Sequence, residues 1–542
     1  MENAQARKRA DQGLASPACA ALPPINQASC VDRDATSLPR LIQGGMGVGV
    51  SSWPLAHQVA ALGQLGVVSG TALDTILIRR LSEGDPGGDL RRAMAAFPAQ
   101  DVARDVLDAY FRPRHTSATA APMTVSDRPR HKAPDPRPRY PLAPLMAATL
   151  TPRRQWLVIL ANFVEVYLAR EGHAGVVGIN YLHKIRPPLL ASLYGAMLAG
   201  VDVVLMGAGI PGDIPDALDQ LSRHSLARVA LDVAGAGDRQ VTTAFDPAAL
   251  WAGQARGGMP RVRRPMFLAI IASASLARAL IKKAPGGIDG FVVEAPIAGG
   301  HNAPPRGAPQ RSPRGEPIYT RRDEVDPTQM ASLGVPFWLA GGYASRQRYL
   351  TARRRGAHGV QVGTAFAFCE ESGLDPQLRR ALLERLRRGE EDVFTDPAAS
   401  PTGFPFKVAA MDQTLSQQAV YDHRPRQCDL GYLRQACPGP DGTIIYRCAA
   451  EPIEDYVAKG GKAEDTIGRK CLCNALLANI GLGQRRADGY EEPPLLTAGN
   501  DLGCIHPFMP RETVSYHARD VVAGILTPSP GEADHNALHP GV

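Results

Sequence analysis

The sequence is poor in several features that would place a protein in a class at once. No apolar run approaches the roughly 18 to 20 residues that a membrane-spanning helix needs, and residues 1–24 hold no apolar core of signal-peptide length. Aromatic residues make up 6% of the 542 residues, and the formal net charge is only +7. We therefore expect a cytoplasmic protein whose partners are neither membranes nor nucleic acids.

Much of the basic excess gathers in one Arg- and Pro-rich stretch, residues 111–140. Few aromatic residues interleave with its basic residues, and no nucleic-acid-binding motif accompanies it. We predict a solvated loop here, with nucleic-acid binding as the alternative.

Cysteine pairs with C-x2-C spacing are also missing. The nine cysteines are unevenly spread, since six fall in the last quarter of the chain. In a reducing compartment they would be free thiols or metal ligands rather than disulfides. Both interpretations stay open, and a tetrahedral thiolate site would draw on the C-x-C pair and its neighbours. The candidates for that site are Cys428, Cys437, Cys448, Cys471 and Cys473.

What the chain does contain is a repeated pattern of short Val-, Ile- and Leu-rich runs, each ending in a small residue. Such runs without polar alternation are typical of strands buried on both faces of a parallel sheet. Helical stretches such as 188–200 and 345–359 lie between them and end in glycine. The predicted strands are 40–45, 65–70, 175–180, 201–207, 266–273, 288–295, 335–342 and 358–366. A ninth run, 227–233, is an extra strand or a competitor for the fifth place.

Eight strand–helix units favour an α/β fold of the (β/α)8 TIM-barrel type over an open, Rossmann-like sheet. The barrel is expected to span residues 37–370, after an unstructured leader at 1–36. Insertions are expected at about 85–165 and 234–264. Residues 371–542 are expected to form a cysteine-containing extension packed on the barrel.

Active sites of barrels lie at the C-terminal ends of the strands, so we expect the site among the residues that follow each run. Glycine is dense there and lets the backbone approach a ligand. The seventh and eighth ends, LAGGYAS and VQVGTAF, place glycines just before helix starts, where N–H groups favour an anion. We predict a phosphate-bearing cofactor at these two ends, with ordinary turns as the alternative.

The sixth end, EAPIAGGHNAPPRG at 294–307, carries a histidine on a glycine-hinged bend. With an unperturbed pKa near 6.5, His301 would suit hydrogen bonding or proton abstraction. A structural histidine in a turn is the alternative. Glu294 is a candidate for orienting this loop or the cofactor, and His173 and His183 are further candidates beside the third strand.

Together these motifs resemble the nitronate monooxygenases, formerly called 2-nitropropane dioxygenases, and the related FMN-dependent enoyl reductases. The segments that carry the resemblance are LIQGGMGVGVS, VGINYL, GAMLAGVDVVLMGAGIP, VVEAPIAGGHNAPPRG, FWLAGGYAS and GVQVGTAF, between about residues 38 and 370. The later stretch DPAASPTGFPFKV resembles a longer bacterial subgroup. The resemblance implies a TIM barrel that holds FMN without a covalent link.

The resemblance also implies roles for individual residues. The end of the first strand would lie beside the isoalloxazine ring, the end of the third would reach its polar edge, and the seventh and eighth ends would hold the phosphate. The implied cofactor-binding residues are Gly44, Gly45, Met46, Asn180, Gly299, Gly300, Gly341, Gly342, Gln361, Gly363 and Thr364. His301 matches the active-site histidine of the family.

The activity so implied is FMN-dependent oxidation of alkyl nitronates by O2 to a carbonyl compound and nitrite. A small-molecule substrate and O2 would be the partners, and the sequence allows a homodimer. Two alternatives stay open: an NAD(P)H-dependent reductase of enoyl thioesters or quinones, and a non-catalytic flavin-binding or scaffold protein. The sequence leaves the family pattern at HNAPPRG, and we expect Pro304 and Pro305 to shape the substrate mouth.

Overall fold

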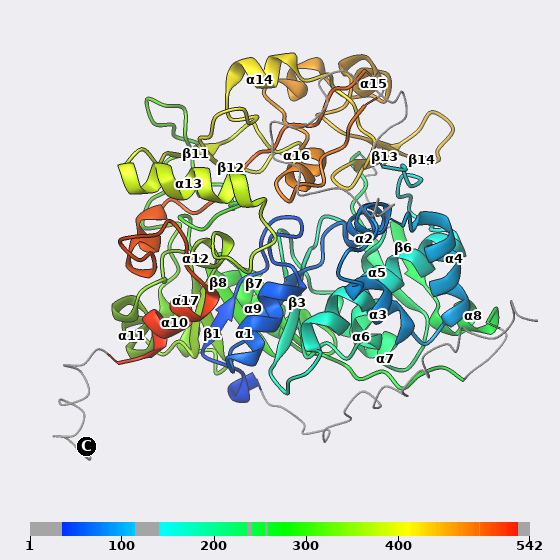
Figure 1. Cartoon of the computed structure of the whole chain (residues 1–542), viewed down its shortest axis with the longest axis horizontal. Helices are drawn as coiled ribbons and strands as arrows, with labels where there is room; N and C mark the ends of the chain where they lie inside the picture. The colour runs from blue at the N-terminus through cyan, green and yellow to red at the C-terminus, as the bar shows by residue number, and fades with distance from the viewer. Residues whose placement is uncertain (1–34, 114–139, 236–240, 255–257, 487, 529–542) are drawn as a thin grey trace, which may run out of the picture. The chain divides into compact units, whose positions relative to one another are not determined.

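Eight short parallel strands form the centre of the fold, and each arises from one of the apolar runs. The computed structural model describes residues 35–113, 140–235, 241–254, 258–486 and 488–528 (Figure 1). The strands are β1 (Leu41–Gln43), β2 (Gly66–Ser69), β3 (Val177–Leu182), β4 (Val203–Gly207), β7 (Met266–Ile271), β8 (Gly290–Glu294), β9 (Phe337–Ala340) and β10 (Gly359–Val362). Nearly all of the expected leader 1–36 and of the Arg-Pro stretch 111–140 lies outside the described residues.

The sheet closes into a barrel. Its order is β1-β10-β9-β8-β7-β4-β3-β2, and every neighbouring pair is parallel. Gln43 donates its backbone N–H to Leu65 over 3.0 Å, and Leu65 donates to Leu41 over 3.1 Å, which joins the first strand to the segment leading into the second. The predicted (β/α)8 barrel is confirmed and the open sheet is wrong, because closure leaves no unpaired strand edge.

Alternate residues of the strands fill the barrel interior, as a period of two requires. A cluster of apolar side chains there includes Ile42, Val67, Leu205, Leu268 and Val292, all fully buried. Trp338 packs with them, and its indole N–H donates to the carbonyl of Pro39 over 3.0 Å. The interior is therefore a packed core, which leaves only the strand ends for a ligand.

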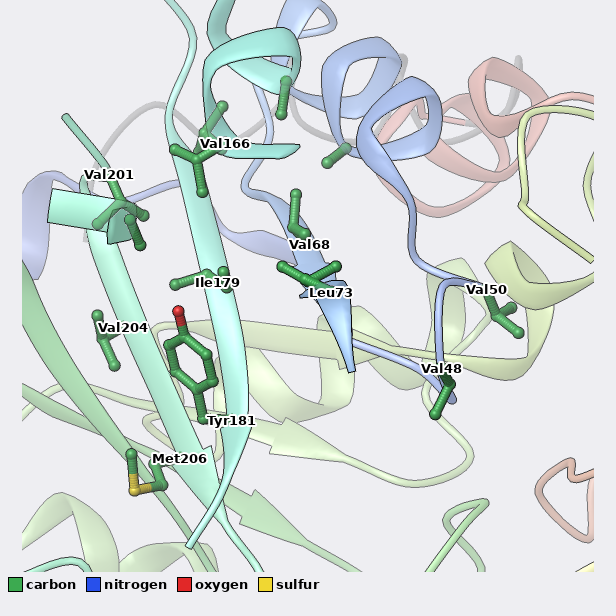
Figure 2. Packing of buried hydrophobic residues seen from close by; sticks show 14 of the residues in the cluster. Val48, Val50, Val68, Leu73, Val166, Ile179, Tyr181, Val201, Val204 and Met206 are labelled. Carbon is green, nitrogen blue, oxygen red and sulfur yellow. The ribbon is translucent and has the colours of Figure 1, made fainter. Parts of the chain in front are cut away.

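The other face of each strand packs against the surrounding helices. These are α1 (Trp53–Ala61), α2 (Leu73–Ser82), α5 (Pro152–Arg170), α6 (Leu189–Leu198), α7 (Ile214–Ser222), α9 (Ala274–Lys283), α10 (Pro327–Ala331), α11 (Arg346–Arg354) and α12 (Thr364–Ala367). Figure 2 shows Val68, Ile179 and Val204 of three neighbouring strands in one packed layer, with Val166 of α5 in the same cluster. Burial of this apolar surface is the main stabilising term of such a fold.

The segment 85–165, expected as an insertion, divides into two parts. It contributes α3 (Asp89–Ala95) and α4 (Gln100–Tyr110), and it also holds most of α5, which leads into β3. α5 lies against α1, α2 and α6. A Cβ on Gly195 of α6 would lie 2.2 Å from the carbonyl oxygen of Ile159, so this close helix contact requires glycine.

The ninth apolar run is an extra strand outside the barrel. β5 (Ala227–Leu231) pairs antiparallel with β6 (Val241–Phe245), and α8 (Pro247–Ala252) follows. Exposed residues alternate with buried ones along β5, whereas every residue of the eight barrel strands is buried or half-buried. The fifth barrel strand is β7 instead.

The chain after the barrel adds small sheets and short helices over the strand ends (Figure 1). Its elements are α13 (Pro376–Arg388), β11 (Val393–Asp396), β12 (Phe406–Ala409), α14 (Gln418–His423), β13 (Gln435–Pro438), β14 (Ile444–Arg447), α15 (Ile453–Ala458), α16 (Leu472–Ala478) and α17 (Ala518–Leu526). α17 returns to pack on α1 and α11. None of the helices in the described ranges is long and apolar enough to cross a membrane.

Candidate active site

A cavity of about 250 Å³ lies at the C-terminal ends of the barrel strands. All twelve residues implied by the sequence resemblance line it: Gly44, Gly45, Met46, Asn180, Gly299, Gly300, His301, Gly341, Gly342, Gln361, Gly363 and Thr364. Residues of the extension, including Tyr432, Leu433, Leu472 and Leu476, form another part of its wall. The folded chain thus brings the predicted residues together and adds a wall that they did not include.

One side of the cavity is a glycine ledge backed by two amide side chains. A Cβ on Gly45 would lie 2.3 Å from the Cβ of Asn180, so the ledge and the amide are in direct contact. Oδ1 of Asn180 and Oε1 of Gln361 are buried and have no hydrogen-bond partner among the described residues. Unpaired buried acceptors are rare and costly in native proteins. These two oxygens therefore fit a ligand that offers N–H or O–H donors.

The ends of β9 and β10 form the part of the cavity where phosphate was predicted. Gly341 and Gly342 have φ values of 91° and 74°, a left-handed conformation that favours glycine. The Thr364 hydroxyl accepts the N–H of Gly499 over 2.9 Å and keeps its own proton to donate. Arg348 donates to the carbonyl of Gly342 over 2.7 Å, which places a guanidinium beside this turn. The proton of the Thr364 hydroxyl, for which no acceptor is found among the described residues, suits an anionic group. The charge of Arg348 is shared with Asp501, which lies 4.0 Å away and lines the cavity.

His301 is held by the extension rather than by its prolines. The backbone on either side of His301 pairs with the segment at β12. The backbone N–H of Lys407 donates to the Gly300 carbonyl, and the backbone N–H of Asn302 donates to the Pro405 carbonyl, both over 2.9 Å. Its ring stands edge-on to Phe406 with centroids 4.9 Å apart. The pairing fixes the ring at the cavity wall.

The environment of His301 changes its titration. Burial and the nearby charge of Lys184 lower its pKa to about 3. The expectation of an ordinary pKa near 6.5 is therefore wrong, because the folded chain removes the solvent that would stabilise the imidazolium. At neutral pH the ring is an uncharged donor and acceptor.

A chain of hydroxyl groups joins His301 to a lysine. Nε2 of His301 lies 2.7 Å from Oγ of Ser400, and Ser400 lies 2.8 Å from the hydroxyl of Thr402. Nζ of Lys184 donates to that hydroxyl over 3.4 Å and sits 3.0 Å from the centre of the Phe404 ring. Burial lowers the pKa of Lys184 to about 7. The chain ends in a group that exchanges protons at neutral pH.

A second ionisable pair lies at the end of β8. Glu294 lines the cavity, and burial raises its pKa to about 7, against the opposing charge of Lys407. Lys407 donates to the Thr395 hydroxyl over 2.8 Å, and burial lowers its pKa to about 8. Clusters of perturbed ionisable groups in one cavity are typical of active sites.

Sequence reasoning missed several of these residues. Lys184, Ser400, Thr402 and Lys407 were not proposed for the site. Three of them, Ser400, Thr402 and Lys407, lie in the stretch DPAASPTGFPFKV. The sequence analysis used that stretch only for its resemblance to a longer bacterial subgroup. Lys184 follows β3 directly and had no distinguishing motif.

Other candidates lie elsewhere. His173 bonds to the Ala169 carbonyl and accepts the Gly175 N–H, so it closes a helix end. His183 contacts Arg186 and is 3.8 Å from Asp213. Neither lines the cavity, and neither do Pro304 and Pro305. The expectation that the two prolines shape the substrate mouth is wrong, since the extension occupies that place.

Four cysteines of the extension form a cluster of thiols. Cys428, Cys448, Cys471 and Cys473 pack together, whereas the Cys437 thiol bonds to the Ile445 carbonyl over 3.7 Å. The seven cysteines within the described ranges are free, and no group of three or more His, Cys, Asp or Glu there is arranged to hold a metal ion. The described residues therefore do not support the thiolate metal site.

The fold and the cavity define a (β/α)8 protein with a glycine-walled ligand site at its strand ends. Comparison with protein families matches residues 263–392 to the nitronate monooxygenase model. A probable nitronate monooxygenase from Bacillus subtilis (strain 168) is 33% identical over 115 residues, which are 21% of this chain and 31% of that protein. The resemblance to this family is thus confirmed, and the matched stretch spans about a third of that relative.

Comparison with solved structures gives matches of low sequence identity, three of which are reported. FabK from Thermotoga maritima has a TM-score of 0.43 and 14% identity, covering 92% of this chain and 94% of its own. A nitroalkane oxidase from Streptomyces ansochromogenes has a TM-score of 0.42 and 15% identity, covering 93% and 98%. The enoyl reductase domain of MlnA from Bacillus amyloliquefaciens has a TM-score of 0.32 and 11% identity, covering 69% and 64%.

Proposed function

We propose that the chain is a flavin-dependent oxidoreductase that binds FMN in this cavity and oxidises alkyl nitronates with O2 to a carbonyl compound and nitrite. The observation that carries the proposal is a pair of buried amide oxygens beside a glycine ledge, Asn180 Oδ1 and Gln361 Oε1, which find no hydrogen-bond partner in the described part of the chain. The match of residues 263–392 to the nitronate monooxygenase model supports the same class of chemistry.

The residues around the cavity fit FMN at both ends. Gly44, Gly45 and Met46 would lie beside the planar ring, and the amide of Asn180 would hydrogen-bond its polar edge. The resemblance places Gln361 at the phosphate, but its side chain lies beside Gly44, so we propose that its amide faces the ring as well. The turns at the ends of β9 and β10, with the Thr364 hydroxyl, would hold the phosphate. When bound, FMN supplies the electron transfer, and the protein supplies orientation and charge stabilisation.

His301 would act on the substrate through its other ring nitrogen. Nε2 faces Ser400, and no hydrogen bond to Nδ1 is found in the part of the chain that the structure describes. When Ser400 donates to Nε2, Nδ1 carries the proton and can donate to a nitronate oxygen. When Nε2 donates to Ser400, Nδ1 can accept the α-proton of a neutral nitroalkane.

The rest of the wall would take the alkyl part of the substrate. Phe406, Leu433, Leu472 and Leu476 line the cavity with apolar surface. Such surface excludes water, and exclusion of water strengthens every hydrogen bond that His301 makes to the substrate.

Spectroscopy and oxygen consumption of the purified full chain test the proposal. We expect a flavin absorbance spectrum, oxygen uptake with ethylnitronate accompanied by nitrite, and no oxygen uptake with NADH. Anaerobic bleaching of the flavin by NADH, with ethylnitronate inert, would show a reductase instead. Protein that is colourless and stays so after FMN is added would show a scaffold without a flavin site.

A further inference from the structure

We propose that Lys184 is the terminal proton acceptor of this site: a proton that His301 takes from the α-carbon of a neutral nitroalkane passes through the hydroxyls of Ser400 and Thr402 to the Lys184 amine. The inference rests on the proposed function and deepens it, because it identifies the group that receives the proton after His301 has taken it from a neutral nitroalkane. It also gives the extension a part in proton transfer, since Ser400 and Thr402 both lie beyond the barrel.

The path is a continuous set of hydrogen bonds between segments that are far apart in sequence. His301 follows β8, Lys184 follows β3, and the two hydroxyls lie between β11 and β12. The steps are 2.7 Å from His301 to Ser400, 2.8 Å from Ser400 to Thr402, and 3.4 Å from Thr402 to Lys184. Each hydroxyl can accept one proton and donate another, so the path needs no movement of heavy atoms.

His301 needs such an acceptor because it cannot keep the proton itself. Burial and Lys184 hold its pKa near 3, so an imidazolium is unstable in this position at neutral pH. Lys184, with a pKa near 7, is neutral in about half of the molecules there and can take the proton. The Phe404 ring, 3.0 Å from Nζ, stabilises the ammonium that results.

Few other charges act on Lys184. His301 is the ionisable group that faces it across the hydroxyls. His183, its neighbour in the chain, bonds to Arg186 and lies near Asp213 instead. Glu294 and Lys407 line or border the same cavity but bond to neither hydroxyl of the path. Lys184 is therefore the group at the end of this path that can hold a proton.

The transfer balances without an oxidant. The α C–H bond breaks and its electron pair becomes part of the nitronate. Nδ1 of His301 gains the proton as Nε2 releases one to Ser400, Ser400 releases one to Thr402, and Thr402 releases one to Lys184. A neutral nitroalkane and a neutral amine become a nitronate and an ammonium.

Two forms of one substrate test the proposal: neutral nitroethane and preformed ethylnitronate, supplied to the holoenzyme. We expect Lys184→Met to lose about 100-fold or more of kcat/KM with nitroethane and less than threefold with ethylnitronate, with its FMN retained. The wild-type rate with nitroethane should rise through a pH near 7, and Lys184→Met should lack that rise. Equal losses with both forms, or no loss with either, would overturn the relay.

Matched variants separate the relay from structural damage. Thr402→Val should reproduce the selective loss, whereas Thr402→Ser, which keeps the hydroxyl, should restore most of it. Lys282→Met, at an exposed lysine on α9, should change neither rate. A Thr402→Val variant with full nitroethane turnover would contradict a path through this hydroxyl.

A measurement without turnover keeps the two proposals distinguishable. If the wild type oxidises neither form, the proposed function fails, and NMR of the full chain with 15N-labelled histidine and lysine decides the relay. A Lys184 titration near pH 7 that also moves the His301 ring nitrogens in the wild type, but not in Thr402→Val, supports it. A Lys184 titration near pH 10, or one that leaves His301 unchanged, overturns it.

Discussion

At the scale of single residues, His301 shows how the fold changes the chemistry of a side chain. In water an imidazole would be partly charged near neutral pH. Here burial and Lys184 lower its pKa to about 3, while Ser400 holds Nε2 at 2.7 Å. The ring therefore acts as a neutral, oriented donor or acceptor, and the charge that titrates near pH 7 belongs to Lys184 and Glu294.

We predict that His301→Ala lowers kcat/KM for ethylnitronate by about 10² to 10⁴, because it removes the group that contacts the substrate. FMN should stay bound, since no backbone group of the ledge or the phosphate turns changes. Stopped-flow reduction of the flavin and its absorbance ratio to protein measure both. His423→Ala, at an exposed histidine of α14, serves as the control. Full turnover in the variant would exclude a catalytic role for His301.

Glu294 gives a prediction about stability and pH. Its pKa is 4.5 when unperturbed and about 7 in the folded protein, so between these values the folded state binds more protons than the unfolded state. Stability must then fall as pH rises from about 4.5 to 7. A shift of this size corresponds to at most about 3 kcal/mol, less what cavity water screens.

We predict that the variant Glu294→Gln lacks the loss of folding stability between pH 4.5 and pH 7. Thermal unfolding of the apoprotein at intervals from pH 4.5 to 8 measures it, and the difference between the two curves isolates Glu294 from other titrating groups. The exposed Glu454→Gln should follow the wild type. A Glu294→Gln curve parallel to the wild type would contradict burial of this carboxyl.

At the scale of elements, the extension is held together by a buried ionic cluster beside its helices. Arg424 makes two bonds to the Glu492 carboxylate, over 2.8 and 3.0 Å, and Arg486 bonds to the same carboxylate and to Asp429. The side chain of Glu492 is 0% exposed. Removing one partner of such a cluster leaves uncompensated buried charge.

We predict that Glu492→Gln destabilises the extension by about 3 to 5 kcal/mol, because it removes the carboxylate that pairs with the buried Arg424 and leaves Arg486 with Asp429 alone. The neighbouring Glu491 pairs with Arg485 at the surface over 3.6 Å, and Glu491→Gln should change stability by less than about 1 kcal/mol. Urea unfolding of both variants provides the comparison. Equal effects would mean that the buried cluster does not hold the extension.

At the scale of the whole molecule, the barrel and the extension share one site. Strand ends provide the glycine ledge and the turns, while the extension provides Ser400, Thr402 and the apolar wall. α17 closes the arrangement by packing back on α1 and α11. The cavity is therefore incomplete in either part alone.

We predict that a chain ended after Glu371 retains no FMN and aggregates, because removal of the extension exposes the cavity and the core face under α13 and α17. Flavin absorbance and size-exclusion chromatography measure the outcome. Expressing residues 372–542 as a second chain in the same cells should recover some soluble, yellow protein. A soluble truncated barrel that binds FMN normally would show that the extension serves another purpose. The homodimer stays a prediction, and size-exclusion chromatography of the full chain would test it.

The sequence by itself determined the barrel and the glycine-lined half of its site. Strands buried on both faces must be almost wholly apolar, and strand ends that approach a ligand need glycine, so both features are local and visible in the order of residues. The twelve implied residues meet at one cavity for that reason. The extra strand β5 differs from the barrel strands in its alternating exposure and its antiparallel partner β6, and a short apolar run reveals neither.

Only the tertiary structure decided what faces these residues from a distance. Lys184 and Ser400 meet His301 across separations of 117 and 99 residues, and no local pattern encodes such a contact. The pKa values of His301, Lys184 and Glu294 depend on burial in the folded chain, because desolvation acts on a charge only once the surrounding chain has excluded water. The same reason explains why the prolines after His301 misled the sequence-based expectation, whereas the extension forms the wall.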